Sequence, residues 1–424
     1  MRLTSTALLL VFAAALAGCN DTLESATYDT PKVSNKVEQP LPGRILAEIQ
    51  KKGMERNSPI MLRIFKEEGK LEVWKAKTNN RFDMIESYDI CAWSGRLGPK
   101  VKEGDRQAPE GFYPLTPYHL NPNSKYFLAI NTGFPNRYDQ ANGRSGTNLM
   151  IHGACSSSGC YSMTDAQILE IYAFARDAFK GGQTSIQLQA FPFRMTAENM
   201  ARHRHSQHIE FWKMLKVGYD QFEVTKRPPE VNVCEKKYVF NQVAADGKSF
   251  AAQAACPPMS TPPALEMAMA GYNSAYDKAY EKAMNKFDGK IWYDPTEAER
   301  KALVADLRRS RAKDLAFAPT GSALKAGKLL DIDDVDPAAL AAPNGAAAIN
   351  RMANNAPGNA APVTNQPVTA QTGPAQTASQ ALATQQTASN IPVPQPNPLA
   401  PPPVASAPEV PPKKKPFWVL WQSE

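Results

Sequence analysis

The chain has 424 residues, of which 43% are hydrophobic and 21% are charged. Its 48 lysines and arginines against 41 aspartates and glutamates leave a formal charge of +7. This excess suits a surface near an anionic polymer or lipid and does not imply nucleic-acid binding. The length allows two or three domains.

Residues 1–19 carry the pattern of a secretory signal. Arg2 supplies an early positive charge, an apolar run covers residues 7–17, and small residues precede Cys19. The run is too short for a spanning helix. Its ending, Leu-Ala-Gly-Cys, resembles a bacterial lipobox, which would make Cys19 the lipidated first residue of an anchored protein. The alternatives are an ordinary signal peptide and a plain membrane anchor. Asn20 slightly favours sorting to the outer membrane, by analogy.

Export predicts a periplasmic location, where disulfides can form. The six cysteines are at positions 19, 91, 155, 160, 234 and 256. Without Cys19 five remain, and an odd number in an exported protein indicates a free, reactive thiol. If Cys160 is that thiol, the other four could form two bridges, in any of three connectivities.

The next two regions differ in composition. Residues 20–57 are polar and contain several prolines, so we expect a tether, with a short helix at about 45–52. Residues 58–240 are predicted to form one α+β domain, a mostly-β sandwich or barrel with flanking helices. Strand-like alternation occurs near 60–65, 71–73, 82–90, 124–133, 147–153 and 184–193. Helices are expected from Thr164 or Asp165 to about 180 and from about 197 to 216.

Residues 241–335 are predicted to form a helical extension, with helices at about 262–287 and 296–315. In the first of these, Tyr272, Tyr276 and Tyr280 recur every four residues, which indicates a packing stripe. From 336 to 424 proline, alanine and glutamine dominate, so this tail cannot bury a core and should be disordered. Its basic and aromatic end could touch a membrane or a partner, or could have no function.

The segment 149–165, LMIHGACSSSGCYSMTD, concentrates residues that can carry chemistry. His152 ends an apolar strand eight residues before Cys160, and a returning loop could bring its imidazole to the thiol. Gly159 allows a sharp turn just before Cys160. A Cys155–Cys160 disulfide, a zinc site and a buried, inert arrangement are the alternatives. The zinc site lacks a fourth ligand nearby.

The surroundings of this pair predict further catalytic features. The helix expected from Thr164 would direct its N-terminal amides toward the cysteine and favour a thiolate. Backbone N–H groups of Gly159, Cys160 or Tyr161 could hold an oxyanion. Elsewhere, RHRHSQH contains His203, His205 and His208, of which only the last two would share a helix face. We therefore favour a polar helix surface there over a metal site.

A second segment, EGDRQAPEGFYPL at 103–115, together with SGCYSM, resembles the catalytic domain of YkuD-type L,D-transpeptidases, and their YafK-like branch in particular. The family shows G-D-x-x-T-P-x-G-x-F, then a histidine-glycine pair, then [ST]-x-G-C. This chain departs from the first motif at Ala108, where threonine is usual. Its histidine-to-cysteine spacing is short for the family, and Ser162 replaces a common arginine. Both of these departures fit the YafK-like branch. The resemblance covers about residues 58–240.

The resemblance implies that Cys160 is the nucleophile and His152 the general base, with Gly159 shaping the turn and Ser157 buttressing the loop. The implied substrates are peptidoglycan stem peptides in a Gram-negative periplasm. An acyl-enzyme thioester would pass to an amine of another stem, or of a lipoprotein or outer-membrane protein. No cofactor, metal or nucleic acid is expected.

Two arginines are candidates for binding the carboxylates of such a substrate. Arg144 and Arg194 fit because guanidinium groups pair well with carboxylates, although either could instead lie on a solvated surface. Two other functions stay open. One is an amidase or hydrolase that uses the same cysteine and histidine to release wall-bound lipoprotein. The other is a non-catalytic, wall-binding lipoprotein.

Overall fold

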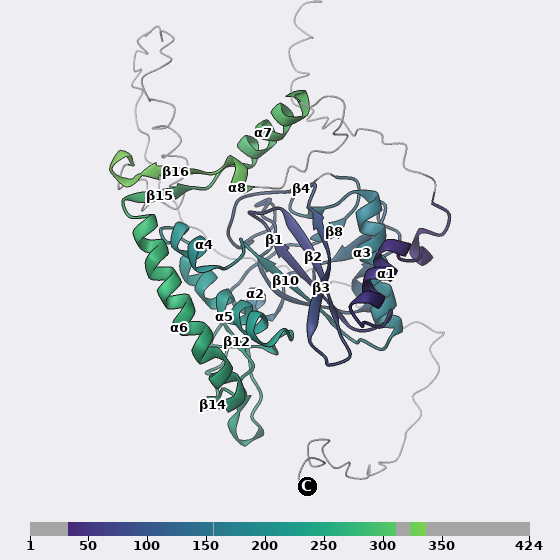
Figure 1. The fold of residues 1–424 in the computed structure, drawn as a ribbon, viewed down its shortest axis with the longest axis horizontal. Coiled ribbons are helices and arrows are strands. Elements are labelled where there is room, and N and C mark those ends of the chain that lie inside the picture. The colour runs from purple at the N-terminus through teal and green to yellow at the C-terminus, as the bar shows by residue number, and fades with distance from the viewer. Residues whose placement is uncertain (1–32, 156, 311–322, 336–424) are drawn as a thin grey trace, which may run out of the picture. The chain divides into compact units, whose positions relative to one another are not determined.

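The structure is a computed structural model that describes residues 33–155, 157–310 and 323–335. The signal pattern with Cys19, the first part of the tether and the proline-rich tail from residue 336 lie outside the described residues. Two five-stranded sheets and the helices around them share the main hydrophobic core (Figure 1). No helix in the described part of the chain is long and apolar enough to cross a membrane.

The first sheet has the strand order β3-β2-β1-β10-β5. Its strands are β1 Ile60–Phe65, β2 Lys70–Ala76, β3 Phe82–Asp89, β5 Gly111–Leu115 and β10 Ile186–Phe191. β1 pairs with β10 in parallel, and the other neighbours are antiparallel. Every residue of β1 is buried, so both faces of this strand are covered.

The second sheet has the order β4-β9-β8-β7-β6 and carries the candidate site. Its short strands are β4 Ala92–Trp93, β6 Leu120–Asn121, β7 Ala129–Asn131, β8 Met150–His152 and β9 Tyr161–Ser162. β8 and β9 run parallel, whereas the other pairs are antiparallel. The chain therefore has to return from the end of β8 to the edge of the sheet where β8 begins before it enters β9. This connection contains the Gly159–Cys160 turn.

Helices cover both sides of the first sheet (Figure 1). The helices are α1 Gly43–Lys51, α2 Arg137–Ala141, α3 Asp165–Lys180, α4 Ala197–Arg202 and α5 Ile209–Thr225. α3 contacts β1, β7 and β8, and so joins the two sheets on one side. On the other side, Tyr219 and Phe222 of α5 pack edge-on against the rings of Phe191 and Trp74, at centroid distances of 5.3 and 5.1 Å.

The predicted α+β class is confirmed, but three expectations about its elements need correction. Leu41, Ile45 and Ile49 are at most 3% exposed, so the later part of the expected tether belongs to the folded core. The helix expected at 197–216 is two helices, α4 and α5, separated by residues 203–208. The strand expected at 124–133 is limited to β7, because an exposed turn occupies the residues before it.

Residues 231–335 add small strand pairs and helices to this core. The strands are β11 Val231–Cys234, β12 Lys237–Phe240, β13 Val243–Ala244, β14 Met259–Ser260, β15 Lys290–Tyr293 and β16 Lys328–Asp331. The helices are α6 Pro263–Lys286, α7 Glu297–Ser310 and α8 Ala323–Ala326. α6 and α7 start close to the predicted positions, while the expected last residues of the second helix lie outside the described residues.

The tyrosines of α6 form the predicted packing stripe. Consecutive rings stack at centroid distances of 6.4 and 6.0 Å. The hydroxyl of Tyr272 donates to Asp220 of α5 at 2.9 Å, and the ammonium of Lys216 lies 3.4 Å from the ring centre of Tyr276. The stripe therefore attaches α6 to α5.

Candidate active site

Cys160 directly precedes β9 and has the free thiol among the described cysteines. The bridges are Cys91–Cys155 and Cys234–Cys256, so one of the three possible connectivities is selected and the Cys155–Cys160 alternative is excluded. The thiol lies 3.6 Å from the backbone oxygen of Asn148.

The turn before Cys160 depends on Gly159. Its φ is +126°, which side chains rarely tolerate, and an added Cβ would lie 3.3 Å from the side chain of Leu149. Gly159 therefore allows the tight turn that the sequence predicts.

Ser157 holds the backbone of Cys160 on both sides. Its hydroxyl donates to the Cys160 carbonyl at 2.7 Å and accepts from the Cys160 N–H at 3.1 Å. A serine has one hydroxyl proton, so Ser94, whose Oγ lies 2.9 Å from Ser157 Oγ, must donate to Ser157. The expected role of Ser157 as a buttress has a direct geometric basis. No local sequence pattern marks Ser94, because its partner is 63 residues away.

The candidate oxyanion donors are not equally available. The Cys160 N–H is already bonded to Ser157, and the Gly159 N–H lies 3.4 Å from the same oxygen. Tyr161 is fully buried, and its hydroxyl donates to the Pro109 carbonyl at 2.6 Å. Which backbone groups would hold an oxyanion stays a prediction.

His152 ends β8 and is 1% exposed. Its Nδ1 lies 2.6 Å from the Gly153 carbonyl. Because a carbonyl can only accept a hydrogen bond, Nδ1 carries the proton and Nε2 presents a lone pair. The ring of Tyr126 lies 4.5 Å from the imidazole, centre to centre, and covers it. This tautomer is the one that a general base acting through Nε2 requires.

The pairing of β8 with β9 brings His152 and Cys160 into the same part of the second sheet. His152 is paired with Ser162. Cys160 lies two positions before Ser162, in the turn that leads into β9. The two residues therefore come from neighbouring segments of the sheet, one at the end of β8 and the other directly before β9.

The electrostatics favour a neutral pair at rest. Burial raises the pKa of the Cys160 thiol, and the Lys100 charge opposes this only in part. Burial also lowers the pKa of His152, although the bond to Gly153 partly offsets it. Near pH 7 the sulfur therefore keeps its proton and the imidazole has none.

The start of α3 has its own bonding partners, and the stabilisation of a thiolate by this helix stays a prediction. α3 begins beyond the far end of β9, where the Thr164 hydroxyl accepts from the N–H of Gln167 at 3.1 Å. The carboxylate of Asp165 accepts from the Ala154 N–H at 2.8 Å. These groups serve the helix end and its neighbouring turn. The dominant effect on the thiol is burial, in the opposite direction.

Lys100 is a nearby cation that sequence reasoning missed. Its side chain is 3% exposed and passes Gly146, where an added Cβ would lie 2.4 Å from Lys100 Cε. Its ammonium is 2.6 Å from Asp105, an aspartate of the recognised G-D motif. Asp105 also accepts from the Gln107 N–H at 2.9 Å. The motif could have indicated that Asp105 organises a loop, but not that it places a lysine near the cysteine.

Neither candidate arginine presents an unpaired guanidinium. Arg144 is bound to Asp139 at 2.9 Å and lies 4.9 Å from the ring centre of Phe211. Arg194 pairs with Glu72 of β2 and lies over the ring of Phe65, at 4.3 Å. These partners are on the side of the first sheet that α5 covers, so the structure does not bring Arg194 to Cys160.

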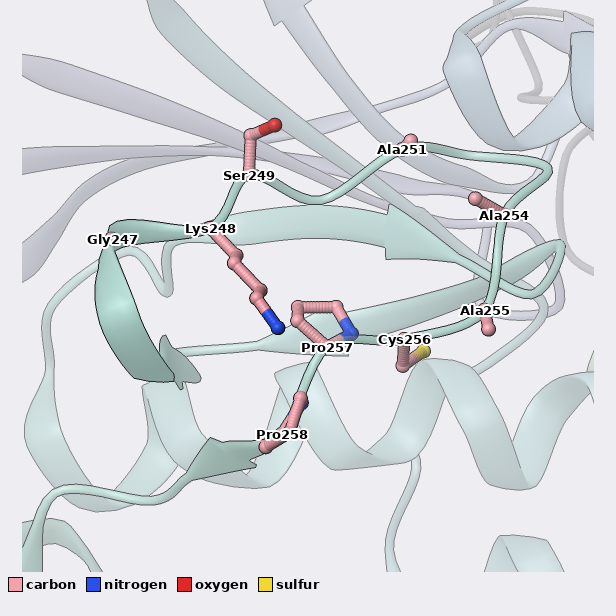
Figure 2. A pocket seen from close by; sticks show the side chains of 9 residues that line it. All are labelled: Gly247, Lys248, Ser249, Ala251, Ala254, Ala255, Cys256, Pro257 and Pro258. Atoms are coloured by element: carbon pink, nitrogen blue, oxygen red, sulfur yellow. The ribbon is translucent and has the colours of Figure 1, made fainter.

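The histidine cluster belongs to the protein interior in part. His203 is 4% exposed and bonded to Glu67 at 2.9 Å, so the prediction of a purely polar surface is wrong for this residue. Within the described residues, no group of three or more histidines, cysteines or acidic residues could hold a metal ion. A pocket at residues 247–258, beside Cys256, is lined by none of the candidate site residues (Figure 2).

Comparisons with known proteins identify the family. The family model of the YkuD L,D-transpeptidase catalytic domain matches residues 62–186. The chain is 44% identical over 236 residues to "Putative L,D-transpeptidase YafK" of Escherichia coli K12, covering 56% of this chain and 88% of that protein. The protein of the same name from Escherichia coli O157:H7 matches equally.

Two solved structures show low overall similarity. The helical cell shape determining protein Pgp2 of Campylobacter jejuni has a TM-score of 0.26 at 16% identity, over 44% of this chain and 79% of that one. Bd1075 of Bdellovibrio bacteriovorus has a TM-score of 0.23 at 19% identity, over 41% and 63%. These two structural likenesses support no statement about function. The identity to YafK extends over most of the length of that protein, and therefore this protein belongs to the YkuD family of L,D-transpeptidases.

Proposed function

We propose that the protein is a cysteine-dependent L,D-transpeptidase that acts on peptidoglycan stem peptides through an acyl-enzyme at Cys160. One observation supports this most. A free thiol directly precedes β9, and the neighbouring strand β8 ends in an imidazole with an unprotonated Nε2. The family supplies the substrate class, because an L,D-transpeptidase domain implies a peptidoglycan substrate.

The first half-reaction begins from the neutral pair. His152 Nε2 takes the thiol proton while the sulfur attacks the carbonyl carbon of the third stem residue, so a C–S bond forms and an oxyanion develops. As the carbonyl re-forms, the C–N bond to the terminal D-alanine breaks. The imidazolium returns its proton to the departing amine, and a thioester remains on Cys160.

The second half-reaction reverses these proton transfers. An acceptor amine gives a proton to His152 as its nitrogen attacks the thioester, and the sulfur leaves and recovers that proton. We propose an amine of a second stem, or of an attached lipoprotein or outer-membrane protein, as the acceptor.

The location is part of the proposal. The two disulfides support an oxidising compartment, which for this family member is the periplasm. We further propose lipidation at Cys19 and anchoring to the membrane, with the outer membrane favoured. Metabolic labelling with a fatty acid, compared with a Cys19→Ser variant, tests this independently of the chemistry.

The deciding experiment incubates the purified protein with a disaccharide tetrapeptide and follows protein and product masses. We expect a thioester adduct on Cys160 and a cross-linked dimer. Both should be lost in Cys160→Ala, and the rate should fall by about 10²- to 10⁴-fold in His152→Ala. His205→Ala is the matched control, because this exposed histidine has no part in the proposed mechanism.

Other products would lead to other conclusions. A tripeptide without dimer would mean that water is the acceptor. Release of wall-bound lipoprotein by the wild type but not by Cys160→Ala would establish the amidase. An unmodified Cys160 together with binding to intact peptidoglycan would leave only a wall-binding role.

A further inference from the structure

The C-terminal extension contacts a segment next to the candidate active site, from outside the matched family domain. Residues 294–300, at the start of α7, lie against residues 93–97, which continue β4 of the second sheet. The match to the family ends at residue 186, so this contact joins a segment outside the matched domain to a strand inside it.

Arg300 is the centre of this contact. It is 2% exposed, and its guanidinium lies 3.7 Å from the ring centre of Trp93. One guanidinium nitrogen donates to the Gly95 carbonyl at 2.7 Å. A second guanidinium nitrogen donates to the Pro295 carbonyl at 3.2 Å, which ties the arginine to its own segment. A planar group that stacks and donates at once is a task for arginine that lysine performs only in part.

Two acidic side chains complete the contact. Glu297 accepts from the Gly95 N–H at 3.1 Å, and Asp294 accepts from the Leu97 N–H at 3.2 Å. Both backbone groups of Gly95 are thus bonded to side chains of the extension. With a φ of +84°, Gly95 has a conformation that most residues adopt only under constraint.

The held segment leads directly to the cysteine. Ser94, which lies between Trp93 and Gly95 in the chain, is fully buried, and its hydroxyl donates to Ser157. Ser157 in turn bonds both the N–H and the C=O of Cys160. Trp93 is also paired with Tyr161 across β4 and β9, so the residues next to Ser94 and Cys160 are directly opposite each other.

We propose that Arg300 is a positioning residue, through which the extension holds residues 93–97 so that Ser94 and Ser157 keep the Cys160 turn in its reactive geometry. This proposal rests on the proposed function of Cys160 as the nucleophile. The extension is then a working part of the active site, although it touches neither the thiol nor the imidazole.

The test compares Arg300→Ala, Arg300→Lys and Ser94→Ala in the full chain. The first readout is single-turnover acylation by the disaccharide tetrapeptide, which should fall about 10- to 100-fold in Arg300→Ala, because displacement of a reacting group by about 1 Å has such an effect. Arg300→Lys should recover part of the rate. The Arg300→Ala/Ser94→Ala double variant should be no slower than the slower single variant, because both changes act on one path.

The second readout is alkylation of Cys160 by iodoacetamide as a function of pH. A loosened turn admits more water to the partly buried thiol, so the pH midpoint of alkylation should move down in Arg300→Ala while acylation slows. A change that merely lowered stability would not produce these opposite effects. Lys286→Ala is the matched control, because Lys286 of the same extension pairs with Glu198 through an exposed contact at 2.6 Å. It should leave both readouts unchanged.

Unchanged acylation and an unchanged alkylation midpoint in Arg300→Ala would overturn the proposal, as would additive losses in the double variant. Alkylation does not require substrate. If the wild type forms no acyl-enzyme and Arg300→Ala still moves the midpoint, the proposed function fails while the positioning of Cys160 stands.

Discussion

Glu68 should make the stability of this protein depend on pH in a way that one substitution removes. It follows β1, its Oε2 is buried, and this oxygen has no hydrogen-bond partner among the described residues. Burial, reinforced by the neighbouring Glu67, raises the pKa of Glu68 from 4.5 to about 7. The ionised form is therefore disfavoured in the folded protein.

The direction and the size of this pH dependence of stability follow from proton linkage. Between pH 4.5 and about 7 the folded state binds more protons at Glu68 than the unfolded state, so stability falls as pH rises through this window. At about 1.4 kcal/mol per pH unit the full effect is about 3 kcal/mol. The residue as a whole is only half-buried, so solvent screening reduces this to about 2 kcal/mol.

Glu68→Gln keeps an acceptor for the Arg194 N–H, which Glu68 binds at 3.0 Å, and cannot ionise. We expect the variant to be about 2 kcal/mol more stable than the wild type near pH 8 and almost equal to it near pH 4.5. Urea unfolding at a series of pH values measures this. Glu210→Gln is the control, since this carboxylate is 80% exposed. Equal stabilisation at both pH values, or a loss near pH 8, would refute the assignment of a buried, protonated carboxyl.

Three further predictions concern the thiol, the core and a disulfide. The rate of Cys160 alkylation should rise with pH, with a midpoint above about 8.5, the ordinary pKa of a thiol, because burial raises the pKa of Cys160. A midpoint below that value would contradict the neutral pair. Replacing Cys91 and Cys155 by serine should lower the free energy of unfolding by about 2–4 kcal/mol, because the bridge joins residues 64 apart, and an unchanged urea midpoint would count against this. Gly218→Ala in α5 should cost about 1–3 kcal/mol, since its Cβ would meet two phenylalanine rings at 2.6 Å. Gly271→Ala in α6 is the control and should not lower the stability, because the added Cβ would extend into open space.

The local elements were predictable because their signals are local. Alternation identified β1, and the capping residue Thr164 located the start of α3. Alternation did not show that Arg63 of β1 is buried beneath α5, 4.5 Å from the ring centre of Tyr219. A charged residue in an alternating pattern predicts a solvated face. Only the helix packed on that face makes the prediction wrong.

The residues of the candidate site also divide into those that a local motif indicates and those whose environment only the fold reveals. A short motif sufficed to single out His152, Gly159, Cys160 and Ser157, because they lie within one turn and the strand before it. The candidate arginines were chosen by charge alone. Charge does not reveal that Arg144 is already paired with Asp139.

The sequence by itself determined the fold class, the helices and strands with strong periodicity, and a histidine and a cysteine as the candidate catalytic residues. The tertiary structure alone decided the disulfide pairing, the link from Ser94 to Ser157 and the attachment of Arg300 to residues 93–97. The physical reason is range. Periodicity and capping act between residues a few positions apart, whereas Arg300 and Gly95 are 205 positions apart and meet only when the chain has folded.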